Sequence, residues 1–328
     1  MSETVVTSPG AAIAQPEPAI AVAGLSKTYR TGFWLTKVVT PLKDFSLTVA
    51  RGETFGLLGP NGAGKTTTIK CLLGIVEPTS GRGTLLGKPL GDRSIKQRVG
   101  YLPENPYFYD YLTAWEFLHF AGKVFRLSDS LLKERIPQLL ELVGLSMDTA
   151  RKKPMRTYSK GMLQRTGMAQ ALINDPELVF LDEPMSGLDP MGRYQMREII
   201  LSLKQQGKTV FFNSHILGDV EVICSRIGLM VGGKLVQQGT LDELLGQSKS
   251  YRVQGHGGAV EQFRDCLEHF SIQGSHWSGE WSGSLPELLN LLNQAGAVVT
   301  DVHWQRQSLE EFFVEQVRAM EGDRPLSA

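Results

Sequence analysis

Hydrophobic and polar residues alternate in short runs over the first part of the chain. Residues 20–30 and 42–50 carry this alternation, and residues 54–58 form a short, mostly apolar run, so each segment predicts a strand. Residues 65–76 place their apolar side chains at helical spacing and predict a helix. Residues 84–101 predict short strands and turns.

The pattern changes to helical spacing between residues 113 and 144. Thr113 is followed three residues later by Glu116, the arrangement of a capping box that opens a helix. Gly144 is suited to end the helical section, because glycine readily adopts the left-handed conformation found after helix ends. One helical face collects the apolar residues Leu131, Leu132, Ile136, Leu139, Leu140 and Val143.

Strand and helix patterns alternate again from about residue 160 to residue 240. Strands are predicted at 177–181, 208–213 and 226–231, with helices between them, one of which covers 160–174. This βαβ rhythm is typical of a mostly parallel sheet. The helical section is therefore predicted to be an insertion into an α/β core.

The two ends of the chain differ from this core. Residues 1–18 contain several prolines among small residues and predict a flexible leader. Residues 246–250 are small and polar and predict a linker. We therefore expect a leader over 1–18, a large α/β domain over 19–245 and a small C-terminal domain over 251–322.

The small C-terminal domain is predicted to mix helices and strands. Helical spacing occurs at 259–270, 285–295 and 308–320, and strand-like runs occur at 251–254 and 297–304. Four histidines in this part lack the spacing of metal ligands, so we expect no metal site there; they are His256, His269, His276 and His303.

Composition narrows the class of protein. With 328 residues, roughly two domains are expected, and 41% hydrophobic with 21% charged residues is ordinary for a globular chain. Lysine plus arginine equals aspartate plus glutamate at 34 each, and this zero balance argues against a protein that grips nucleic acid by bulk charge. Three scattered cysteines exclude a disulfide framework. No apolar stretch is long enough to span a membrane, so a cytoplasmic chain is expected.

The segment from Gly59 to Thr66 carries the first clear chemistry. It fits the pattern G-x-x-x-x-G-K-[ST] between a predicted strand and a predicted helix. Glycines let the backbone curl so that successive N–H groups face an anion, and the helix N-terminus adds its positive end. Lys65 would place its charge on the β- and γ-phosphates, and the Thr66 hydroxyl would ligate Mg²⁺. No Asn-Lys-x-Asp motif occurs, which favours adenine over guanine.

A second acidic motif follows the predicted strand at 177–181. The run Leu178-Val-Phe-Leu-Asp-Glu183 delivers two carboxylates at the end of an apolar strand. Asp182 would hold Mg²⁺, and Glu183 would polarise the attacking water. Alone, such a pair is as well explained by a turn or a helix cap.

These motifs, in this order and spacing, resemble the nucleotide-binding subunit of ABC transporters over residues 20–245. The remaining motifs that carry the resemblance are Tyr29 as the adenine-stacking aromatic, Glu104 at the Q-loop position, Tyr158-Ser159-Lys160-Gly161-Met162 at the signature, Ser186-Gly-Leu-Asp189 as the D-loop and His215 as the switch histidine. The resemblance implies an α/β P-loop NTPase fold: a RecA-like core, an antiparallel β subdomain, a helical insertion at about 102–165, and a small α+β C-terminal domain.

The resemblance also implies the site and its ligands, ATP and Mg²⁺. Two chains would form a head-to-tail dimer, with each ATP held between the phosphate loop of one chain and the signature of the other. Catalysis would fall to Glu183, His215 and Lys65, and the metal would be held by Thr66, Glu104 and Asp182. ATP would contact Tyr29, Gly59, Pro60, Asn61, Gly62, Ala63, Gly64, Lys65, Thr66, Thr67, Ser159, Lys160 and Gly161.

The sequence departs from the family pattern at two motifs. Glu104 replaces the usual glutamine of the Q-loop, and it adds a charge that can bind Mg²⁺ but repels the γ-phosphate. In the signature, Lys160 replaces a glycine and Met162 a glutamine, while Ser159 and Gly161 are kept. Such variants resemble the ABC-2 export branch.

A family member of this kind needs a separate transmembrane permease, which would place the chain at the inner face of the cell membrane. After Glu104 come four aromatics that suit a permease contact or, equally, packing of the helical insertion; they are Tyr107, Phe108, Tyr109 and Tyr111. Phe33 and Trp34 likewise suit either a permease contact or packing in the core. The C-terminal part ends like Ser308-Leu-Glu-Glu-Phe-Phe of ABC-2 ATPases, which suggests regulation or dimer contacts.

Two other functions compete with an exporter ATPase. A soluble ABC protein acting on ribosomes or DNA would carry two cassettes or added zinc or coiled-coil elements, and none is found. A degenerate cassette would serve as a nucleotide-gated binding module. Glu104 and the altered signature favour this reading mildly, whereas intact Lys65, Asp182, Glu183 and His215 oppose it.

Overall fold

A computed structural model describes residues 17–31, 36–246, 250–305 and 308–321. Nearly all of the expected leader over 1–18, and both Phe33 and Trp34, lie outside these residues. The chain divides into two compact units, Met1–Gln237 and Gln238–Ala328.

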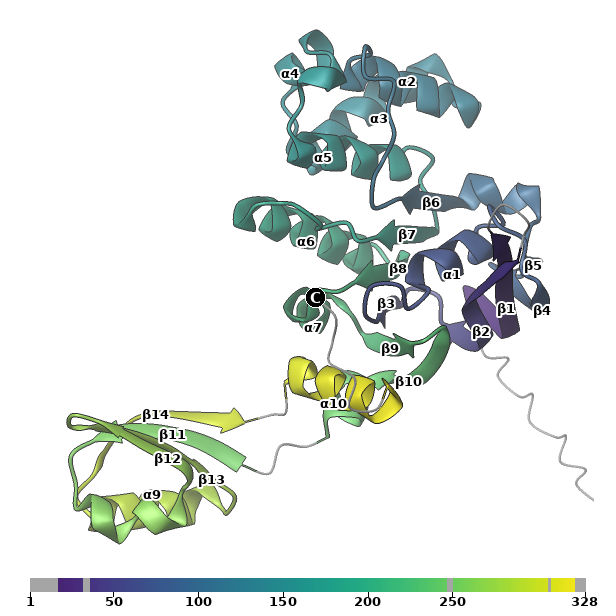
Figure 1. Ribbon diagram of the computed structural model, residues 1–328. Coiled ribbons are helices and arrows are strands. Elements are labelled where there is room, and N and C mark those ends of the chain that lie inside the picture. Colours follow the sequence, from purple (N-terminus) through teal and green to yellow (C-terminus); the bar gives the residue numbers. More distant parts are fainter. Residues whose placement is uncertain (1–16, 32–35, 247–249, 306–307, 322–328) are drawn as a thin grey trace, which may run out of the picture. The chain divides into compact units, whose positions relative to one another are not determined.

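The first unit is built on a six-stranded sheet with the order β10-β9-β3-β8-β7-β6 (Figure 1). Neighbouring strands from β9 to β6 pair in parallel. Every residue of β3, β7 and β8 is buried, as expected for a parallel sheet covered on both faces. The strands are β3 (Thr54–Leu58), β6 (Val99–Leu102), β7 (Leu178–Asp182), β8 (Thr209–Ser214), β9 (Arg226–Val231) and β10 (Lys234–Thr240).

A parallel sheet brings the carboxyl ends of its strands to one edge. In the register of this sheet Leu58 pairs with Ser214, and Asp182 pairs with Asn213. The loops after β3, β7 and β8 therefore begin side by side, although more than a hundred residues separate the first from the others. This edge carries the phosphate loop and the acidic pair.

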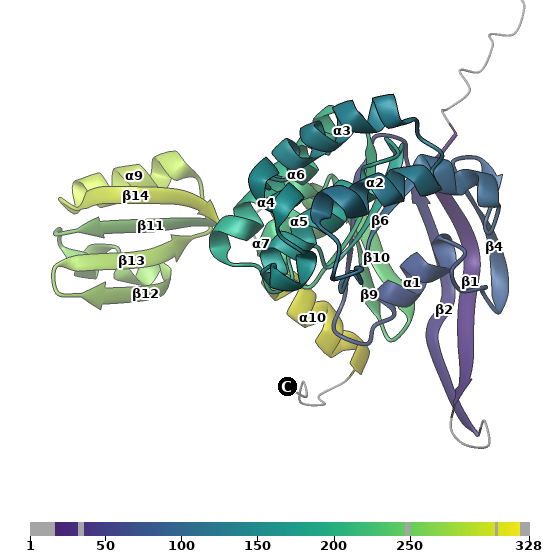
Figure 2. The ribbon, with the colours of Figure 1, turned by 90° about the horizontal axis from the view of Figure 1, so that it is seen from above.

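An antiparallel sheet with the order β2-β1-β4-β5 forms the second layer. Its strands are β1 (Ile20–Thr31), β2 (Lys37–Val49), β4 (Ser80–Leu85) and β5 (Lys88–Pro89). β1 and β2 make a long ribbon (Figure 2). One core joins this sheet to α1 (Lys65–Leu72) and the parallel sheet through buried residues such as Phe45, Phe55 and Ile69.

A helical section follows β6 and precedes β7 along the chain (Figure 1). The expected capping box is confirmed: Thr113 accepts from the Glu116 backbone N–H, and the Glu116 carboxylate accepts from Thr113. Serine side chains cap the next three helices, at Ser128, Ser146 and Ser159. The helices are α2 (Ala114–Val124), α3 (Asp129–Leu142), α4 (Met147–Lys152) and α5 (Lys160–Ala171). After β7 and β8 come α6 (Pro190–Gln205) and α7 (Leu217–Ile223).

The second unit contains a four-stranded antiparallel sheet with the order β12-β13-β11-β14. Helix α9 covers one face of this sheet (Figure 2), and Trp277, Val253 and Leu288 are buried in the core between them. The elements are α8 (Leu241–Leu245), β11 (Ser250–His256), β12 (Glu268–Gln273), β13 (His276–Trp281), α9 (Leu285–Gln294), β14 (Val298–Gln305) and α10 (Leu309–Glu321).

The prediction of a helix over 259–270 is wrong. The structure has two short 3₁₀ turns, η3 (Val260–Gln262) and η4 (Arg264–Cys266), and then β12. The buried residues Phe263 and Leu267 lie at helical spacing, but they pack under the sheet from the two turns. Strand β13 is not among the strands expected from the sequence, although its alternation of Trp277, Gly279 and Trp281 on the buried side is a strand signal.

Candidate nucleotide-binding site

The phosphate loop connects β3 to α1 and depends on glycine at three positions. Gly62 and Gly64 have φ angles of 80° and 108°, in the region that side chains rarely adopt. A methyl group on Gly64 would lie 2.0 Å from the carbonyl oxygen of Pro41, and one on Gly59 would lie 2.3 Å from that of Met230. The loop can therefore keep its tight curl against two neighbouring strands only with glycine there.

Lys65 begins α1 and is only 7% exposed. Its Nζ donates hydrogen bonds to the carbonyl oxygens of Gly59 at 2.7 Å and Pro60 at 3.3 Å. It also lies 3.7 Å from Oε1 of Glu183. The ammonium group is thus held at the mouth of the loop, at the place where the loop would receive phosphate oxygens.

Asp182 ends β7 and is almost completely buried. Its Oδ1 accepts hydrogen bonds from Asn213 Nδ2 at 3.1 Å and Thr66 Oγ1 at 3.3 Å. Its Oδ2 is buried with no hydrogen-bond partner among the described residues. Burial raises the pKa of this carboxyl, and the nearby Glu104 charge raises it further, while the two hydrogen bonds and Lys65 lower it.

This arrangement fits a divalent cation such as Mg²⁺. A carboxylate with an unsatisfied buried oxygen, next to a threonine hydroxyl, supplies the hard oxygen ligands that Mg²⁺ prefers. The negative charges of Asp182 and Glu104 repel each other, and the negative potential that they create together attracts a cation.

Glu183 follows Asp182 and has an unusual backbone. Its φ is 50°, a conformation that costs free energy in a residue with a side chain and persists where the surrounding structure holds it. Its Oε2 lies 2.7 Å from Nδ1 of His215 and accepts from the His215 backbone N–H at 3.4 Å. The turn after β7 thus aims a buried carboxylate between Lys65 and His215.

Lys65, Glu183 and His215 share one cleft of roughly 480 Å³, and Asp182 reaches its lining through Thr66. It is lined by Pro41, Asn61, Gly62, Ala63, Gly64, Lys65, Thr66, Thr67, Glu104, Glu183, Ser186 and His215. Pro41 comes from β2 and was not expected; no pattern in the sequence marks it, because the antiparallel sheet alone brings it to the loop. The cleft is therefore a polar pocket assembled from both sheets of the first unit.

Tyr29 lies on β1 opposite Val39 and is hydrogen bonded to the Thr67 side chain. Burial is the main reason that its pKa is raised. The Nζ of Lys27 lies 5.2 Å from the centre of the Tyr29 ring. Tyr29 is not part of the cleft lining, but Thr67 links the ring to that lining.

The signature segment does not line the cleft of its own chain. Ser159 caps α5, its Oγ accepting from Met162 N at 3.2 Å, and Lys160 and Gly161 form the first turn. One chain thus brings together the phosphate loop, Asp182, Glu183, Glu104 and His215 but leaves Ser159, Lys160 and Gly161 outside.

The aromatic residues after Glu104 divide into two groups. Phe108 is buried and packs edge-on against Phe117 at 5.0 Å, so for this residue the packing alternative holds. Tyr107, Tyr109 and Tyr111 are 94%, 47% and 66% exposed. These three rings therefore offer a surface, whereas Phe108 anchors the segment to the helical section.

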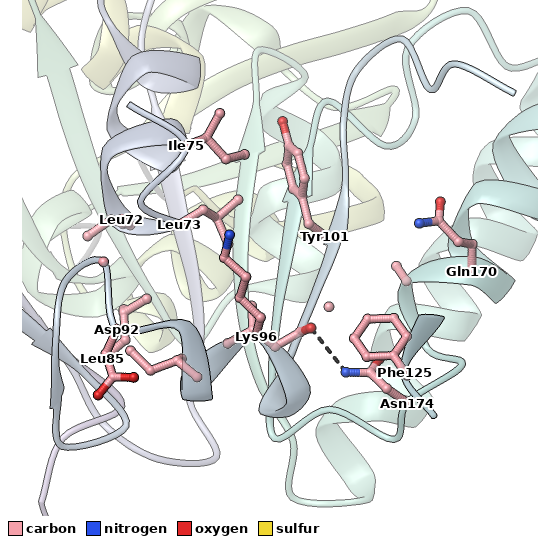
Figure 3. Close-up of a pocket in the computed structure, with 15 residues that line it drawn as sticks. Leu72, Leu73, Ile75, Leu85, Asp92, Lys96, Tyr101, Phe125, Gln170 and Asn174 are labelled. Atoms are coloured by element: carbon pink, nitrogen blue, oxygen red, sulfur yellow. Dashed lines mark hydrogen bonds between the residues drawn. The ribbon is translucent and has the colours of Figure 1, made fainter. Parts of the chain in front are cut away.

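A separate apolar groove of about 250 Å³ lies beyond the end of α1 (Figure 3). Its apolar lining includes Leu72, Leu73, Ile75, Tyr101 and Phe125. Asn174 borders the groove and donates to the backbone carbonyl oxygens of Gln97 and Val99. Ile75 is 56% exposed, which is unusual for a large aliphatic side chain.

The fold and the cleft together define a P-loop ATPase. A glycine loop between a buried strand and a helix, followed at the same sheet edge by a buried acidic pair and a histidine, is the arrangement that binds and cleaves a nucleoside triphosphate. Comparison with known proteins gives the particular kind of P-loop ATPase.

A family model described as ABC transporter matches residues 42–186. An uncharacterized ABC transporter ATP-binding protein of Nostoc sp. is 58% identical over 303 residues, which cover 91% of this chain and 90% of that protein. The bacitracin transport ATP-binding protein BcrA of Bacillus licheniformis is 36% identical over 86% of this chain and 95% of its own length. The Nod factor export ATP-binding protein I of Cupriavidus pinatubonensis is 36% identical over 77% of each chain.

Solved structures agree with these relatives. The structure of an ATP-binding subunit of an ABC transporter is 32% identical, with a TM-score of 0.61 over 69% of this chain and 91% of that one. A bacterial ABC transporter cassette solved as a dimer shares the fold at 23% identity, with a TM-score of 0.62 over 68% of this chain and 98% of that one. The chain belongs to the ABC transporter ATP-binding family, and it is an ATP-binding ABC ATPase.

Two features are absent from the described residues. Among them, no helix is both long and apolar enough to cross a membrane. Nor do three or more histidine, cysteine, aspartate or glutamate side chains gather there as a preformed metal cluster.

Proposed function

We propose that this ABC ATPase is the motor subunit of an ABC-2-like exporter, which works as a head-to-tail dimer and drives a separate transmembrane permease. The observation that carries the proposal is the cleft in which Lys65, Glu183 and His215 meet at one edge of the parallel sheet. The relatives named for bacitracin transport and Nod factor export support the exporter assignment.

The nucleotide would be held chiefly through its phosphates. Backbone N–H groups of the loop 61–65 would face the anion, and Lys65 supplies a buried positive charge. The ammonium group of Lys65 contacts the Gly59 and Pro60 carbonyl oxygens and Glu183. Binding would replace these contacts by phosphate oxygens, while Tyr29 would stack on adenine.

We propose that Thr66, Asp182 and Glu104 hold the Mg²⁺ of the nucleotide. When bound, the metal neutralises charge on the β- and γ-phosphates. Asp182 contributes the buried oxygen that lacks a partner in the described residues. Thr66 orients Asp182 through its hydroxyl at 3.3 Å, and Glu104 lies on the cleft wall within electrostatic reach of Asp182.

Glu183 would orient the attacking water and receive its proton as the water oxygen bonds to the γ-phosphorus and the bond to the β–γ bridging oxygen breaks. His215 fixes the Glu183 carboxylate through the 2.7 Å contact. Lys65 would stabilise the charge that develops on the phosphoryl oxygens. Most of the rate enhancement would come from this positioning and charge stabilisation.

We propose that the second chain completes the site. Ser159, Lys160 and Gly161 lie outside their own chain's cleft and at the N-terminus of α5, where Ser159 and the helix amides suit an anion. In a head-to-tail pair, this segment would cover the triphosphate bound by the partner. The dimeric cassette structure of a relative supports this arrangement.

The permease would dock on the exposed aromatic surface of the helical section and place the chain at the inner face of the membrane. Tyr109 lies 6.1 Å from Tyr111 and 5.8 Å from Phe120, ring centre to ring centre, and Phe120 and Val124 are also exposed. Such a cluster of rigid, exposed rings suits an interface anchor. The apolar groove of Figure 3 would extend this surface through Ile75 and Phe125.

A nucleotide-gated binding module is the second candidate, and Glu104 is the observation that favours it. An extra carboxylate on the cleft wall opposes the γ-phosphate as well as attracting a metal. Such a module would bind ATP without turning it over.

The test is ATP hydrolysis measured against protein concentration, with Lys65→Ala as the control. An exporter motor gives a rate per chain that rises with concentration as dimers form and that vanishes in Lys65→Ala. ATP binding without turnover, both alone and with the permease, would contradict the motor assignment and support the binding module.

A further inference from the structure

The signature lysine and the D-loop glycine are in contact within one chain. Gly187 lies in the turn after β7, with a φ of 69°. A methyl group on Gly187 would lie 2.3 Å from Nζ, 2.8 Å from Cε and 2.9 Å from Cδ of Lys160. The end of the Lys160 side chain, its ammonium group together with the last two stem carbons, therefore rests directly on the bare backbone of Gly187.

The neighbouring residues Gly161 and Leu188 also lie near each other. A methyl group on Gly161 would lie 3.5 Å from Cδ2 of Leu188, which is an ordinary packing distance. Leu188 is only 7% exposed, and Met185 on the same turn is 1% exposed. The start of α5 and the turn 183–188 thus form one packed unit, although they are more than twenty residues apart.

The turn that Lys160 covers also carries groups of the cleft. Ser186 N donates to Glu183 O at 3.0 Å, and Leu188 N donates to Met185 O at 3.3 Å, so the turn is continuous from Glu183 to Leu188. Glu183 and Ser186 line the cleft, whereas Gly187 faces Lys160. Two successive residues of one turn therefore contact two different functional segments.

We propose that Lys160 is a positioning residue: its aliphatic stem holds the turn 183–188 in place, and through that turn it sets the Glu183 carboxylate in its own chain. This inference rests on the proposed function, because Lys160 can affect a second nucleotide site only in the head-to-tail dimer. There, Lys160 stands beside the ATP held by the partner, so its stem would join the two nucleotide sites mechanically. Glycine at 187 is what lets the stem approach the backbone.

Two variants of Lys160 separate the stem from the charge. Lys160→Met removes the ammonium and keeps most of the stem, whereas Lys160→Ala removes both. We expect kcat for ATP hydrolysis to be about tenfold lower in Lys160→Ala than in Lys160→Met, with the KM for MgATP equal in the two. A role limited to the charge at the partner's phosphates predicts equal kcat in the two variants, which would overturn the proposal.

Gly187→Ala tests the same contact from the other side. The new methyl group displaces the lysine side chain and also strains the backbone at the positive φ of Gly187. The strain is present with or without Lys160, so only the loss that passes through the contact is shared with Lys160→Ala. We expect the double variant to lose at least threefold less than the product of the two single losses. If the kcat loss of the double variant equals the product of the two single losses, Lys160 and Gly187 do not act through a shared contact. Lys133→Ala, an exposed lysine of α3, serves as the control.

Amide hydrogen exchange tests the positioning role of Lys160 without requiring ATP turnover. In the nucleotide-free chain, the backbone amides of Ser186 and Leu188 should exchange several-fold faster in Lys160→Ala than in Lys160→Met, without a change in the global unfolding temperature. Equal exchange in the two variants would refute the positioning role. If the wild-type chain shows no ATP turnover, either alone or with the permease, the motor assignment fails while this measurement still decides the role of Lys160.

Discussion

Oε2 of Glu183 lies 2.7 Å from Nδ1 of His215, although the two residues follow different strands of the parallel sheet. The pairing of β7 with β8 brings them together, and the positive φ of Glu183 turns its side chain toward the histidine. A carboxylate held in this way can take a proton from water without first reorganising.

Glu183→Gln should abolish turnover and keep nucleotide binding. The amide preserves the shape of the side chain but cannot accept a proton from water, so we expect kcat to fall by about 100-fold or more. ATP should still bind and should trap the dimer. Size-exclusion chromatography with ATP and a steady-state ATPase assay measure both effects. Near-normal hydrolysis would remove Glu183 from its role.

His215→Ala should reduce kcat more than it changes nucleotide affinity. The substitution leaves Oε2 of Glu183 without its side-chain partner, so the carboxylate is no longer fixed toward the water. We expect a loss of roughly tenfold to 100-fold in kcat and a change in ATP dissociation constant below about threefold. A mainly affinity-based defect, measured by titration with labelled ATP, would assign His215 to binding instead.

Asp182→Asn should stabilise the nucleotide-free chain at neutral pH while abolishing ATP hydrolysis. Burial raises the pKa of Asp182, so the folded state favours the protonated form more than the unfolded state does. Stability from this group is therefore full below the usual aspartate pKa of about 3.9 and is lost as pH rises through the raised value. The Asp182→Asn side chain cannot ionise, so the variant does not lose this stability as the pH rises.

Thermal unfolding at pH 4, 6 and 8 tests this predicted change of stability with pH. The unfolding temperature of Asp182→Asn should exceed that of the wild type at pH 8, and the difference should shrink toward pH 4. A variant that is less stable than the wild type at pH 8 would mean that the charged Asp182 is favourable in the nucleotide-free fold.

Tyr29→Ala should weaken ATP binding with little effect on the chemical step. Stacking of a base on an aromatic ring is worth about 1–3 kcal/mol, so we expect the KM for ATP to rise by roughly tenfold. Tyr29→Phe loses only the hydrogen bond to Thr67 and should keep most of the affinity. Equal KM values in the alanine variant and the wild type would show that adenine does not stack here.

Trp277→Ala should unfold the C-terminal unit selectively. This side chain is 2% exposed, packs against Phe263 at 4.9 Å between ring centres, and donates from Nε1 to Gly257 O. Its removal should cost about 3–5 kcal/mol, the usual range for a large aromatic in a core. Limited proteolysis should then cleave beyond residue 250 first, and cleavage inside the first unit at the same rate would contradict this.

The sequence alone predicted what is local. The phosphate loop from Gly59 to Thr66 and the acids Asp182 and Glu183 each lie on one strand end, so their residue types and order reveal them. The capping box at Thr113 is likewise a matter of four consecutive residues. In contrast, the helix predicted at 259–270 failed because Phe263 and Leu267 are buried under the C-terminal sheet, and packing outweighs helical spacing.

Only the tertiary structure decided which distant residues meet. Strand pairing in the parallel sheet sets Glu183 beside His215 and Lys65, and the antiparallel sheet carries Pro41 to the loop. The stem of Lys160 crosses Gly187 because α5 and the turn after β7 pack together, which no pattern of spacing expresses. Local conformation follows from neighbouring residues, whereas contacts over a hundred residues depend on which buried surfaces pack, and this is a property of the whole core.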